Sequence, residues 1–203
     1  KLADMYIDVE LTVTERTAMH KYTFNQPGEA NLLLDLQNGL VFNSKNIRYR
    51  VLEGEVEMLD NKTIAGYNRV RGWVARYFYY MIVFDRPYTV KKELPQEEGE
   101  KAKRFILEFD LKEGESVQVK VALSTVGIEG AKMALDKENP GWNFESIKAE
   151  TNGKWNDMLS LVEVEGTEEE KMNFYTSMYH LFIQPTNIAD IDGKYRGAND
   201  SIF

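Results

Sequence analysis

The chain of 203 residues contains no cysteine. This absence excludes a disulfide framework and thiolate metal sites, and it leaves the redox compartment open. The sequence also has no run of about 18 apolar residues, so it predicts no membrane span. The chain opens with neither a signal-peptide pattern nor Met, because Lys1 leads directly into a strand-like pattern. We therefore expect the natural N-terminus to lie upstream or to have been removed.

Basic side chains are fewer than acidic ones, with 25 Lys and Arg against 33 Asp and Glu and a formal net charge of -8. Nucleic-acid binding requires a basic surface, so this balance argues against a nucleic-acid partner. A neutral sugar, a peptide or no ligand at all is equally compatible with it. The hydrophobic share of 43% is ordinary for a soluble globular protein, and a chain of this length can bury a substantial core.

The common signatures of catalytic and phosphate-binding sites are missing. No G-x-G-x-x-G, G-x-x-x-x-G-K-[ST] or G-x-S-x-G motif occurs. The two histidines, His20 and His180, are far apart and lack a nearby Ser, Cys or His at ligand spacing. We interpret both as structural side chains, and for His180 we favour packing over a substrate contact. The acidic residues within 97–100 are adjacent and unsupported, so we expect a solvated loop there and not a cation site.

Alternating apolar and polar residues fill the first two thirds of the chain. This period of two predicts strands with one buried face and one wet face. Residues 91–103 are charged and contain Pro95 and Gly99, so we expect an exposed loop. The strands expected from the pattern cover 7–13, 20–24, 31–36, 47–52, 54–59, 63–67, 72–84, 104–110 and 116–125.

The period changes from two to roughly 3.6 near Val126, which indicates helices. Thr167 and Glu170 form a capping box at the start of the clearest helix. Gly153 is a point at which the preceding helix could be split. Strands followed by helices favour an all-β domain joined to the start of a helical one over alternating βαβ units. The expected helices cover 129–137, 143–159 and 167–184.

The aromatic-rich stretch of residues 73–84 has three interpretations. Alternate aromatic side chains in a strand usually pack into the core, and we favour that interpretation. Exposed rings on a β-sandwich could instead stack on sugars, and rings at a domain boundary could form an interdomain contact. The sequence leaves these alternatives open. We expect Trp142 and Trp155 to pack the helices against the sheet.

The tail of the chain concentrates polar side chains in residues 190–197. Asp190 and Asp192 are two positions apart, so in an extended backbone their side chains point the same way. Calcium loops use such a spacing, although the EF-hand pattern is not matched here. Two carboxylates also suit acid and base catalysis at a glycosidic bond. The spacing alone favours an Asp-Gly turn held by Asx hydrogen bonds.

Several segments of the chain resemble the family 92 glycoside hydrolases. Residues 174–180, F-Y-T-S-M-Y-H, are similar to a family helix of the type F-Y-T-A-L-Y-H. Residues 190–197, D-I-D-G-K-Y-R-G, are similar to a family loop of the type D-V-D-G-R-Y-R-G. Weaker similarities in the family's order lie at 14–24, 126–131 and 155–166.

The resemblance implies a mainly β fold. It predicts an antiparallel β-sandwich, then linker helices, then the first helix of an (α/α)6-type catalytic domain. We expect the sandwich over residues 1–126, with its opening strands missing at the N-terminus. The linker helices are expected over 127–166 and the start of the catalytic domain over 167–203.

The resemblance also implies a function: the chain is expected to be part of an inverting exo-α-mannosidase that trims terminal α-linked mannose. The partners would be a mannose-containing glycan and the remainder of the catalytic domain. Ca2+ is implied for the parent enzyme, and none is expected in this chain. An extracellular or periplasmic location is implied in the same way. The alternative is a free-standing carbohydrate-binding or adhesion module.

The family's catalytic and calcium-binding residues are expected to lie mostly beyond Phe203. We therefore assign no catalytic or metal-binding residue here and expect the chain alone to be inactive. As substrate-binding residues we predict Asp190, Asp192, Tyr195 and Arg196, because their groups hydrogen-bond to sugar hydroxyls and their loop is the most family-like stretch. The alternative is that Asp192 only turns the chain and that Arg196 pairs with a carboxylate to fix the turn.

Overall fold

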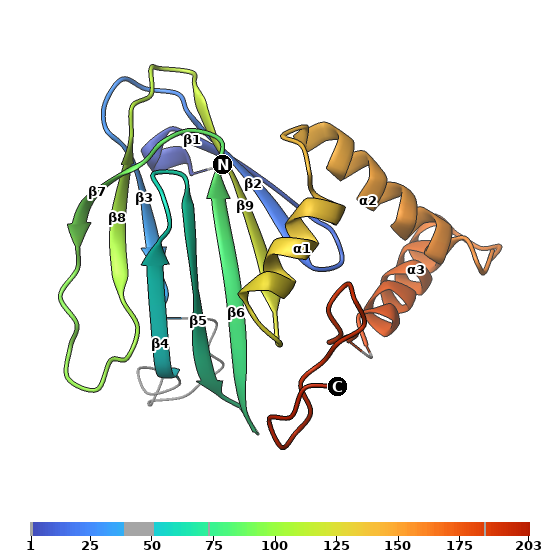
Figure 1. Cartoon of the computed structure of the whole chain (residues 1–203). Helices are drawn as coiled ribbons and strands as arrows, with labels where there is room; N and C mark the ends of the chain where they lie inside the picture. The colour runs from blue at the N-terminus through green and yellow to red at the C-terminus, as the bar shows by residue number, and fades with distance from the viewer. Residues whose placement is uncertain (1, 39–50, 73, 185) are drawn as a thin grey trace.

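The computed structural model describes residues 2–38, 51–72, 74–184 and 186–203. Two antiparallel sheets face each other, and three helices follow them in the chain (Figure 1). This arrangement confirms the expected mainly β fold with a sandwich followed by helices. The larger sheet has the strand order β1-β2-β9-β6-β5-β4, and the smaller sheet has the order β3-β8-β7.

The helices and strands have the following bounds: η1 Ala3–Met5, β1 Ile7–Val13, β2 Thr17–Phe24, β3 Ala30–Asp35, β4 Val51–Met58, β5 Thr63–Arg71, β6 Ala75–Phe84, β7 Thr89–Glu93, β8 Arg104–Phe109, β9 Ser116–Ser124, α1 Ile128–Glu138, α2 Phe144–Leu159 and α3 Glu168–Phe182.

The main core lies between the two sheets. Successive side chains of a strand point to opposite faces, so each strand gives the core every second residue. Tyr80, Ile82 and Phe84 of β6 are buried there, as are Leu107 of β8 and Val117 of β9. We call this side of the larger sheet its inner face and the opposite side its outer face.

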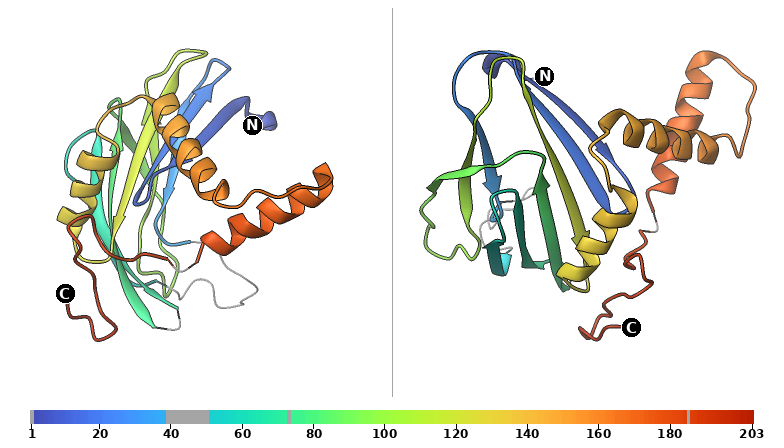
Figure 2. Two further views of the ribbon diagram at one scale, coloured as in Figure 1. Left: turned by 90° about the vertical axis from the view of Figure 1, so that its right-hand side faces the viewer. Right: turned by 45° about the horizontal axis from the view of Figure 1, so that its top comes forward.

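A second, smaller core lies on the outer face under α1. Ala131 and Ala134 of α1 are fully buried against Ala65, Met81 and Ala122 of the sheet. Alanine on both sides lets the helix approach the strands closely. Helix α2 runs beside β1 and β2, and α3 packs on α2 (Figure 2). The helices therefore lie on the outer face and along one edge of the sandwich.

The charged stretch at 91–103 is more ordered than the sequence indicates. Residues 91–93 belong to β7, which pairs with β8, so the expectation of a loop is wrong there. Glu100 is only 8% exposed, so the solvated loop expected at 97–100 is also wrong at this residue. Its carboxylate accepts a hydrogen bond from Arg104 at 2.8 Å and another from the Glu97 N–H. These partners replace the water that an acidic side chain otherwise needs.

Strand boundaries differ from the expectation in the middle of the chain. Residues 51–58 form one strand, β4, where the sequence suggested two strands separated near Glu53. The pairing register shifts between Val51 and Glu53, so the irregularity is a bulge and not a turn. Strand β5 continues to Arg71. Residues 47–50 and Trp73 lie outside the described residues.

The helix predictions are confirmed. Asn143 caps α2 by accepting a hydrogen bond from the Ser146 N–H, and α2 continues without a break through Gly153. Thr167 and Glu170 form both hydrogen bonds of the predicted capping box. Helix α3 has no buried residue, however, so in this structure its apolar side has little to pack on.

The aromatic stretch divides between the two faces of the larger sheet. Tyr80 and Phe84 point into the core, which confirms the favoured interpretation for them. Tyr77 and Tyr79 have the opposite strand parity and contact the ring of Tyr67 on the outer face. His20 is partly buried on the inner face and forms a hydrogen bond of 2.9 Å with the Tyr22 hydroxyl, as expected of a structural histidine.

Candidate functional site

A cavity of about 470 Å3 lies where the tail of the chain meets the sandwich. The turn between β1 and β2 forms one wall, and the ends of β6 and β9 form another. Tail residues 186–190 close the third side. The lining combines apolar side chains, including Phe78 and Leu123, with the charged side chains of Arg16 and Asp190.

Asp190 is the predicted site residue that lines this cavity. It is only 5% exposed, and one carboxylate oxygen accepts a hydrogen bond of 2.6 Å from the Ser124 hydroxyl. Burial raises the pKa of Asp190, although the Ser124 hydrogen bond opposes the rise. A side chain on Gly130, in the first turn of α1, would collide with this carboxylate. Asp190 therefore fastens the tail against the start of α1.

Arg16 fastens the tail from the other side. Its Nε donates to the Ala189 carbonyl at 3.0 Å, and its Nη1 forms a 2.8 Å ion pair with Glu138 at the end of α1. Thr14 also donates to Glu138 at 2.6 Å. Burial alone would raise the pKa of Glu138, but the hydrogen bonds from Thr14 and Arg16 outweigh it and lower that pKa.

Asp192 lies in an exposed turn. Its Oδ1 accepts from the Lys194 N–H at 3.1 Å, and its Oδ2 pairs with the Lys194 ammonium at 2.7 Å. These interactions lower the pKa of Asp192. Gly193 has a φ of +86°, so the backbone turns here and is not extended. The Asp-Gly turn held by an Asx hydrogen bond, which the spacing favoured, is therefore confirmed, and the extended backbone that would point Asp190 and Asp192 the same way is not formed.

The side chain of Arg196 contacts the sandwich at the end of β9. Its Nε donates to the Thr125 carbonyl at 2.7 Å and its Nη2 to the Val126 carbonyl at 3.0 Å. The guanidinium also lies 5.1 Å from the centroid of the Tyr77 ring. The suggested carboxylate partner of Arg196 is thus wrong for the described residues, because main-chain carbonyls and tyrosine rings take its place.

Tyr195 carries the one aromatic ring of residues 190–197. It is 41% exposed and stacks on Phe203 with ring centroids 5.5 Å apart. Tyr195 and Phe203 also exchange two main-chain hydrogen bonds of 3.0 Å, which close a small hairpin. This hairpin presents the Tyr195 phenol at the surface.

The structure thus divides the four predicted residues into two pairs. The side chains of Asp190 and Arg196 are hydrogen-bonded to residues at the end of β9, while Asp192 and Tyr195 lie at the surface. Their chemistry suits hydrogen bonding and ring stacking with a sugar. The residues that hold the loop, namely Arg16, Ser124 and Glu138, were not predicted from the sequence. Arg16 could have been suspected, because it belongs to the family-like T-x-R segment.

Within the part of the chain that the structure describes, no group of three or more His, Cys, Asp or Glu side chains is placed to hold a metal ion. The helices in the same part are all too short or too polar to cross a membrane.

Comparison with protein families gives two adjoining matches. Residues 1–124 match the Glycosyl hydrolase family 92 N-terminal domain. Residues 130–203 match the Glycosyl hydrolase family 92 catalytic domain. Among curated proteins, a search found no match.

Solved structures share the fold. The family GH92 alpha-mannosidase BT3965 from Bacteroides thetaiotaomicron matches all of this chain with a TM-score of 0.86 and 26% identity. The same protein in complex with mannoimidazole matches with a TM-score of 0.86 and 25% identity. The family GH92 inverting mannosidase BT2199 from Bacteroides thetaiotaomicron VPI-5482 matches 97% of the chain with a TM-score of 0.80, and its 20% identity supports the fold alone. This chain spans 28% of the length of BT3965 and 27% of that of BT2199.

Proposed function

This chain belongs to glycosyl hydrolase family 92, and from that premise we propose that its parent protein is an inverting exo-α-mannosidase that trims terminal α-linked mannose from glycans. The observation that carries the proposal is the order of the two family domains along one chain, at residues 1–124 and 130–203. The parent protein is the longer chain that contains these residues.

The stereochemistry of the product tests this proposal. The parent would be incubated with an α-mannoside and the released sugar followed by NMR. An inverting glycosidase places a water between two carboxylates about 6.5–9.5 Å apart, so β-mannose is expected first. Release of α-mannose, or of no mannose, contradicts the proposal.

We propose that the 203-residue chain releases no mannose alone. The carboxylate of Asp190 is buried against Ser124, and that of Asp192 is paired with Lys194. The two groups therefore do not flank a common water, as an inverting acid and base must. Release of mannose by the purified chain contradicts this part.

We propose that Ca2+ acts in the parent through residues outside this chain. Calcium takes about six to eight oxygen ligands. Asp190 does not fit such a site, because its carboxylate is buried against Ser124, and Asp192 alone supplies at most two of the oxygens. A chelator is expected to inactivate the parent and to leave the melting temperature of the 203-residue chain unchanged.

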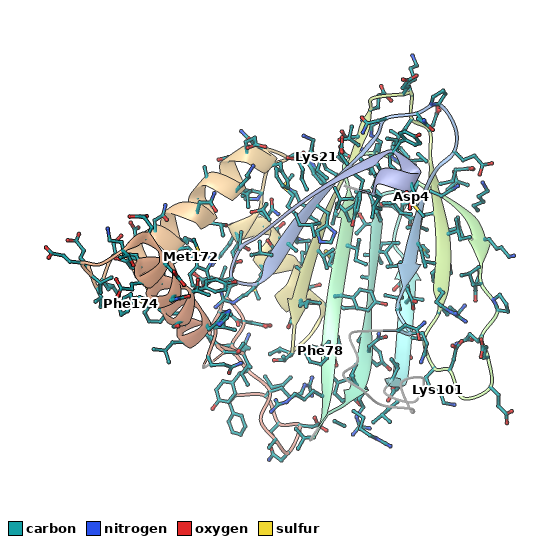
Figure 3. All side chains as sticks on the ribbon, turned by 180° about the vertical axis from the view of Figure 1, so that it is seen from behind. Asp4, Lys21, Phe78, Lys101, Met172 and Phe174 are labelled. Atoms are coloured by element: carbon teal, nitrogen blue, oxygen red, sulfur yellow. The ribbon has the colours of Figure 1, made fainter. Side chains whose placement is uncertain are left out.

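We propose that the remainder of the catalytic domain packs on α3. In the proposed division at 1–126, 127–166 and 167–203, α3 is the first helix of that domain, and it lies within the stretch that matches the family's catalytic domain. Its exposed apolar side chains include Met172, Phe174 and Leu181, which are 68%, 37% and 69% exposed. Met172 and Phe174 are labelled in Figure 3. A helix of this length gains most of its stability from packing, so these side chains need a partner.

We further propose that chain upstream of Lys1 completes the smaller sheet. Among the described residues the larger sheet has six strands and the smaller has three, so in this part of the chain the smaller sheet does not face all of the inner face. By strand alternation this part includes Leu11, Val13, Phe78 and Leu123, which are 62%, 49%, 36% and 50% exposed. Phe78 is labelled in Figure 3. An apolar surface of this kind inside a sandwich normally packs against a facing strand.

We propose that Asp192 and Tyr195 contact the sugar in the parent and that Asp190 and Arg196 position them. The exposure of the first pair and the anchoring of the second support this division. An extracellular or periplasmic location is proposed as well, and fractionation of the source cells tests it.

The competing function is a free-standing carbohydrate-binding or adhesion module. The match of residues 130–203 to a catalytic domain disfavours it. Sequencing the gene beyond Phe203 separates the two, because the enzyme requires a long helical region and the module requires a stop codon.

A further inference from the structure

The turn between β1 and β2 holds the tail of the chain through one arginine. Arg16 lies in this turn, and its side chain is 18% exposed. Its Nε donates to the Ala189 carbonyl at 3.0 Å, while its Nη1 forms the 2.8 Å ion pair with Glu138. The two contacts use different nitrogen atoms of one planar guanidinium, a geometry that lysine does not offer. Arg16 therefore links the end of α1 to the residue directly before Asp190.

Glu138 fixes the orientation of this guanidinium. Its Oε2 accepts hydrogen bonds from the Thr14 hydroxyl at 2.6 Å and from the Arg16 main-chain N–H at 2.9 Å. Its Oε1 accepts from Nη1 of Arg16, so both carboxylate oxygens are engaged by the turn. Thr14 in turn forms a hydrogen bond of 2.8 Å with the Thr17 hydroxyl. The place of the Arg16 side chain is therefore set by β1, β2 and α1 and not by the tail that it holds.

The point at which the tail is held lies immediately before the loop with the proposed sugar contacts. Arg16 holds Ala189, and the next residue, Asp190, is anchored by its buried carboxylate. The Asp190 N–H then donates to the Lys194 carbonyl at 2.7 Å, which closes a short turn. Asp192 lies inside this turn, three residues after Ala189. A shift of the Ala189 carbonyl would therefore move the Asp192 carboxylate with it.

We propose that Arg16 is a positioning residue for the hydrolysis of α-mannosides by the parent: it holds the loop so that Asp192 meets the sugar, and Glu138 holds Arg16. This inference rests on the proposed function and adds that a residue of the sandwich sets how the sugar is recognised. Arg16 belongs to the stretch that matches the N-terminal domain, and its partners Glu138 and Ala189 belong to the stretch that matches the catalytic domain. A misplacement of about 1 Å in a group that orients the substrate can cost roughly a hundredfold in rate.

The kinetics of the parent on a nitrophenyl α-mannoside test this role. Arg16→Lys keeps a positive charge beside Glu138 but replaces the planar fork with a single ammonium, so kcat/KM should fall roughly tenfold or more. Arg104→Lys is the matched control. Arg104, in the smaller sheet, is 19% exposed, pairs with Glu100 at 2.8 Å and donates to the Pro95 carbonyl at 2.8 Å. Its substitution should lower the melting temperature to a similar extent and leave kcat/KM unchanged.

A double substitution tests whether Arg16 acts through the loop. If Arg16 places Asp192, Arg16→Lys should cost much less kcat/KM in a parent that already carries Asp192→Asn, because effects on one path are not additive. Glu138→Gln covers the case in which Arg16→Lys does not fold. The glutamine amide accepts hydrogen bonds through only one of its two head atoms, so it should loosen Arg16 and lower kcat/KM in the same direction.

Two results overturn the positioning role while the proposed function stands. One is an equal kcat/KM for Arg16→Lys and Arg104→Lys, and the other is a full loss from Arg16→Lys in the parent that carries Asp192→Asn. A wild-type parent that releases no mannose refutes the proposed function, and the positioning role falls with it. Mannose release by the wild type is measured first, so the two kinds of failure are distinguishable.

Discussion

At the scale of single residues, Asp190 ties the tail to the sandwich through a buried hydrogen bond with Ser124. Asp190→Ala leaves the Ser124 hydroxyl without this acceptor, which should cost about 1–3 kcal/mol in unfolding free energy. Asp190→Asn keeps an acceptor and should cost less. Urea unfolding of the two variants at pH 7 measures the difference, and equal losses would contradict the anchoring role.

The stability that Asp190 contributes should depend on pH, and this dependence gives a second test of its anchoring role. Its pKa is raised in the folded chain, mainly by burial. The folded state therefore holds the Asp190 proton more tightly than the unfolded state does. The resulting contribution to the unfolding free energy is complete below pH about 4 and declines as the pH rises through the folded pKa. As the pH rises through the folded pKa of Asp190, the unfolding free energy of the wild-type chain should fall relative to that of Asp190→Asn.

Arg16 and Glu138 form the second tie, and their side chains are 18% and 13% exposed. Arg16→Met removes one partner and leaves a mostly buried carboxylate, so we expect a loss of about 3 kcal/mol. The double variant with Glu138→Met should recover part of this loss, because no unpaired charge remains. Chemical unfolding measures both. An exposed pair such as Lys132 and Asp136 provides the control, since its loss should change stability little.

A substitution of Asp192 in the parent can distinguish a sugar-binding role of this residue from a purely structural one. If it contacts the sugar, Asp192→Asn should reduce turnover and leave the melting temperature unchanged, because the amide keeps the Asx hydrogen bond to Lys194. Mannose release and thermal unfolding would be measured on the same preparation. A lower melting temperature with unchanged turnover contradicts the sugar-binding role.

At the scale of secondary structure, α3 depends on its capping box. Thr167→Ala removes the hydroxyl that accepts from the Glu170 N–H and should cost about 1 kcal/mol of helix stability. Faster amide hydrogen exchange in α3 would reveal it. Thr176→Ala, in the middle of the same helix, is the matched control and should not destabilise it, because alanine has the higher helix propensity. Equal effects of the two substitutions would contradict the role of the cap.

Local patterns explain why most elements could be predicted from the sequence. The capping box of α3 and the Asn143 cap of α2 involve residues three positions apart, so the sequence alone displays them. Glu100 could not be placed in this way. Its burial depends on Arg104 and on the fold around it, and the local composition indicates only a charged loop.

At the scale of the whole molecule, the site is assembled by contacts that no local pattern displays. Ser124 and Asp190 are 66 positions apart, and Arg16 and Ala189 are 173 positions apart. The sequence identified the loop through a resemblance and could not show that its turn directs Asp190 inward and Asp192 outward. The sandwich therefore holds the loop in place and joins the parts of this chain that match the two family domains.

The exposed apolar side chains of the inner face lead to a prediction about lysine substitutions, whose effect on stability should differ between this chain and its parent. Leu11→Lys and Leu123→Lys replace side chains that are 62% and 50% exposed in this chain, so each should change its unfolding free energy little. In the parent, an upstream segment should bury the same positions, and each substitution should cost about 1.5–3 kcal/mol or more. Leu33→Lys, at a residue 60% exposed on the outward side of the smaller sheet, is the control and should be tolerated in both proteins. Chemical unfolding of matched variants measures the difference. If the parent tolerates lysine at positions 11 and 123 as well as the chain does, no segment covers the inner face.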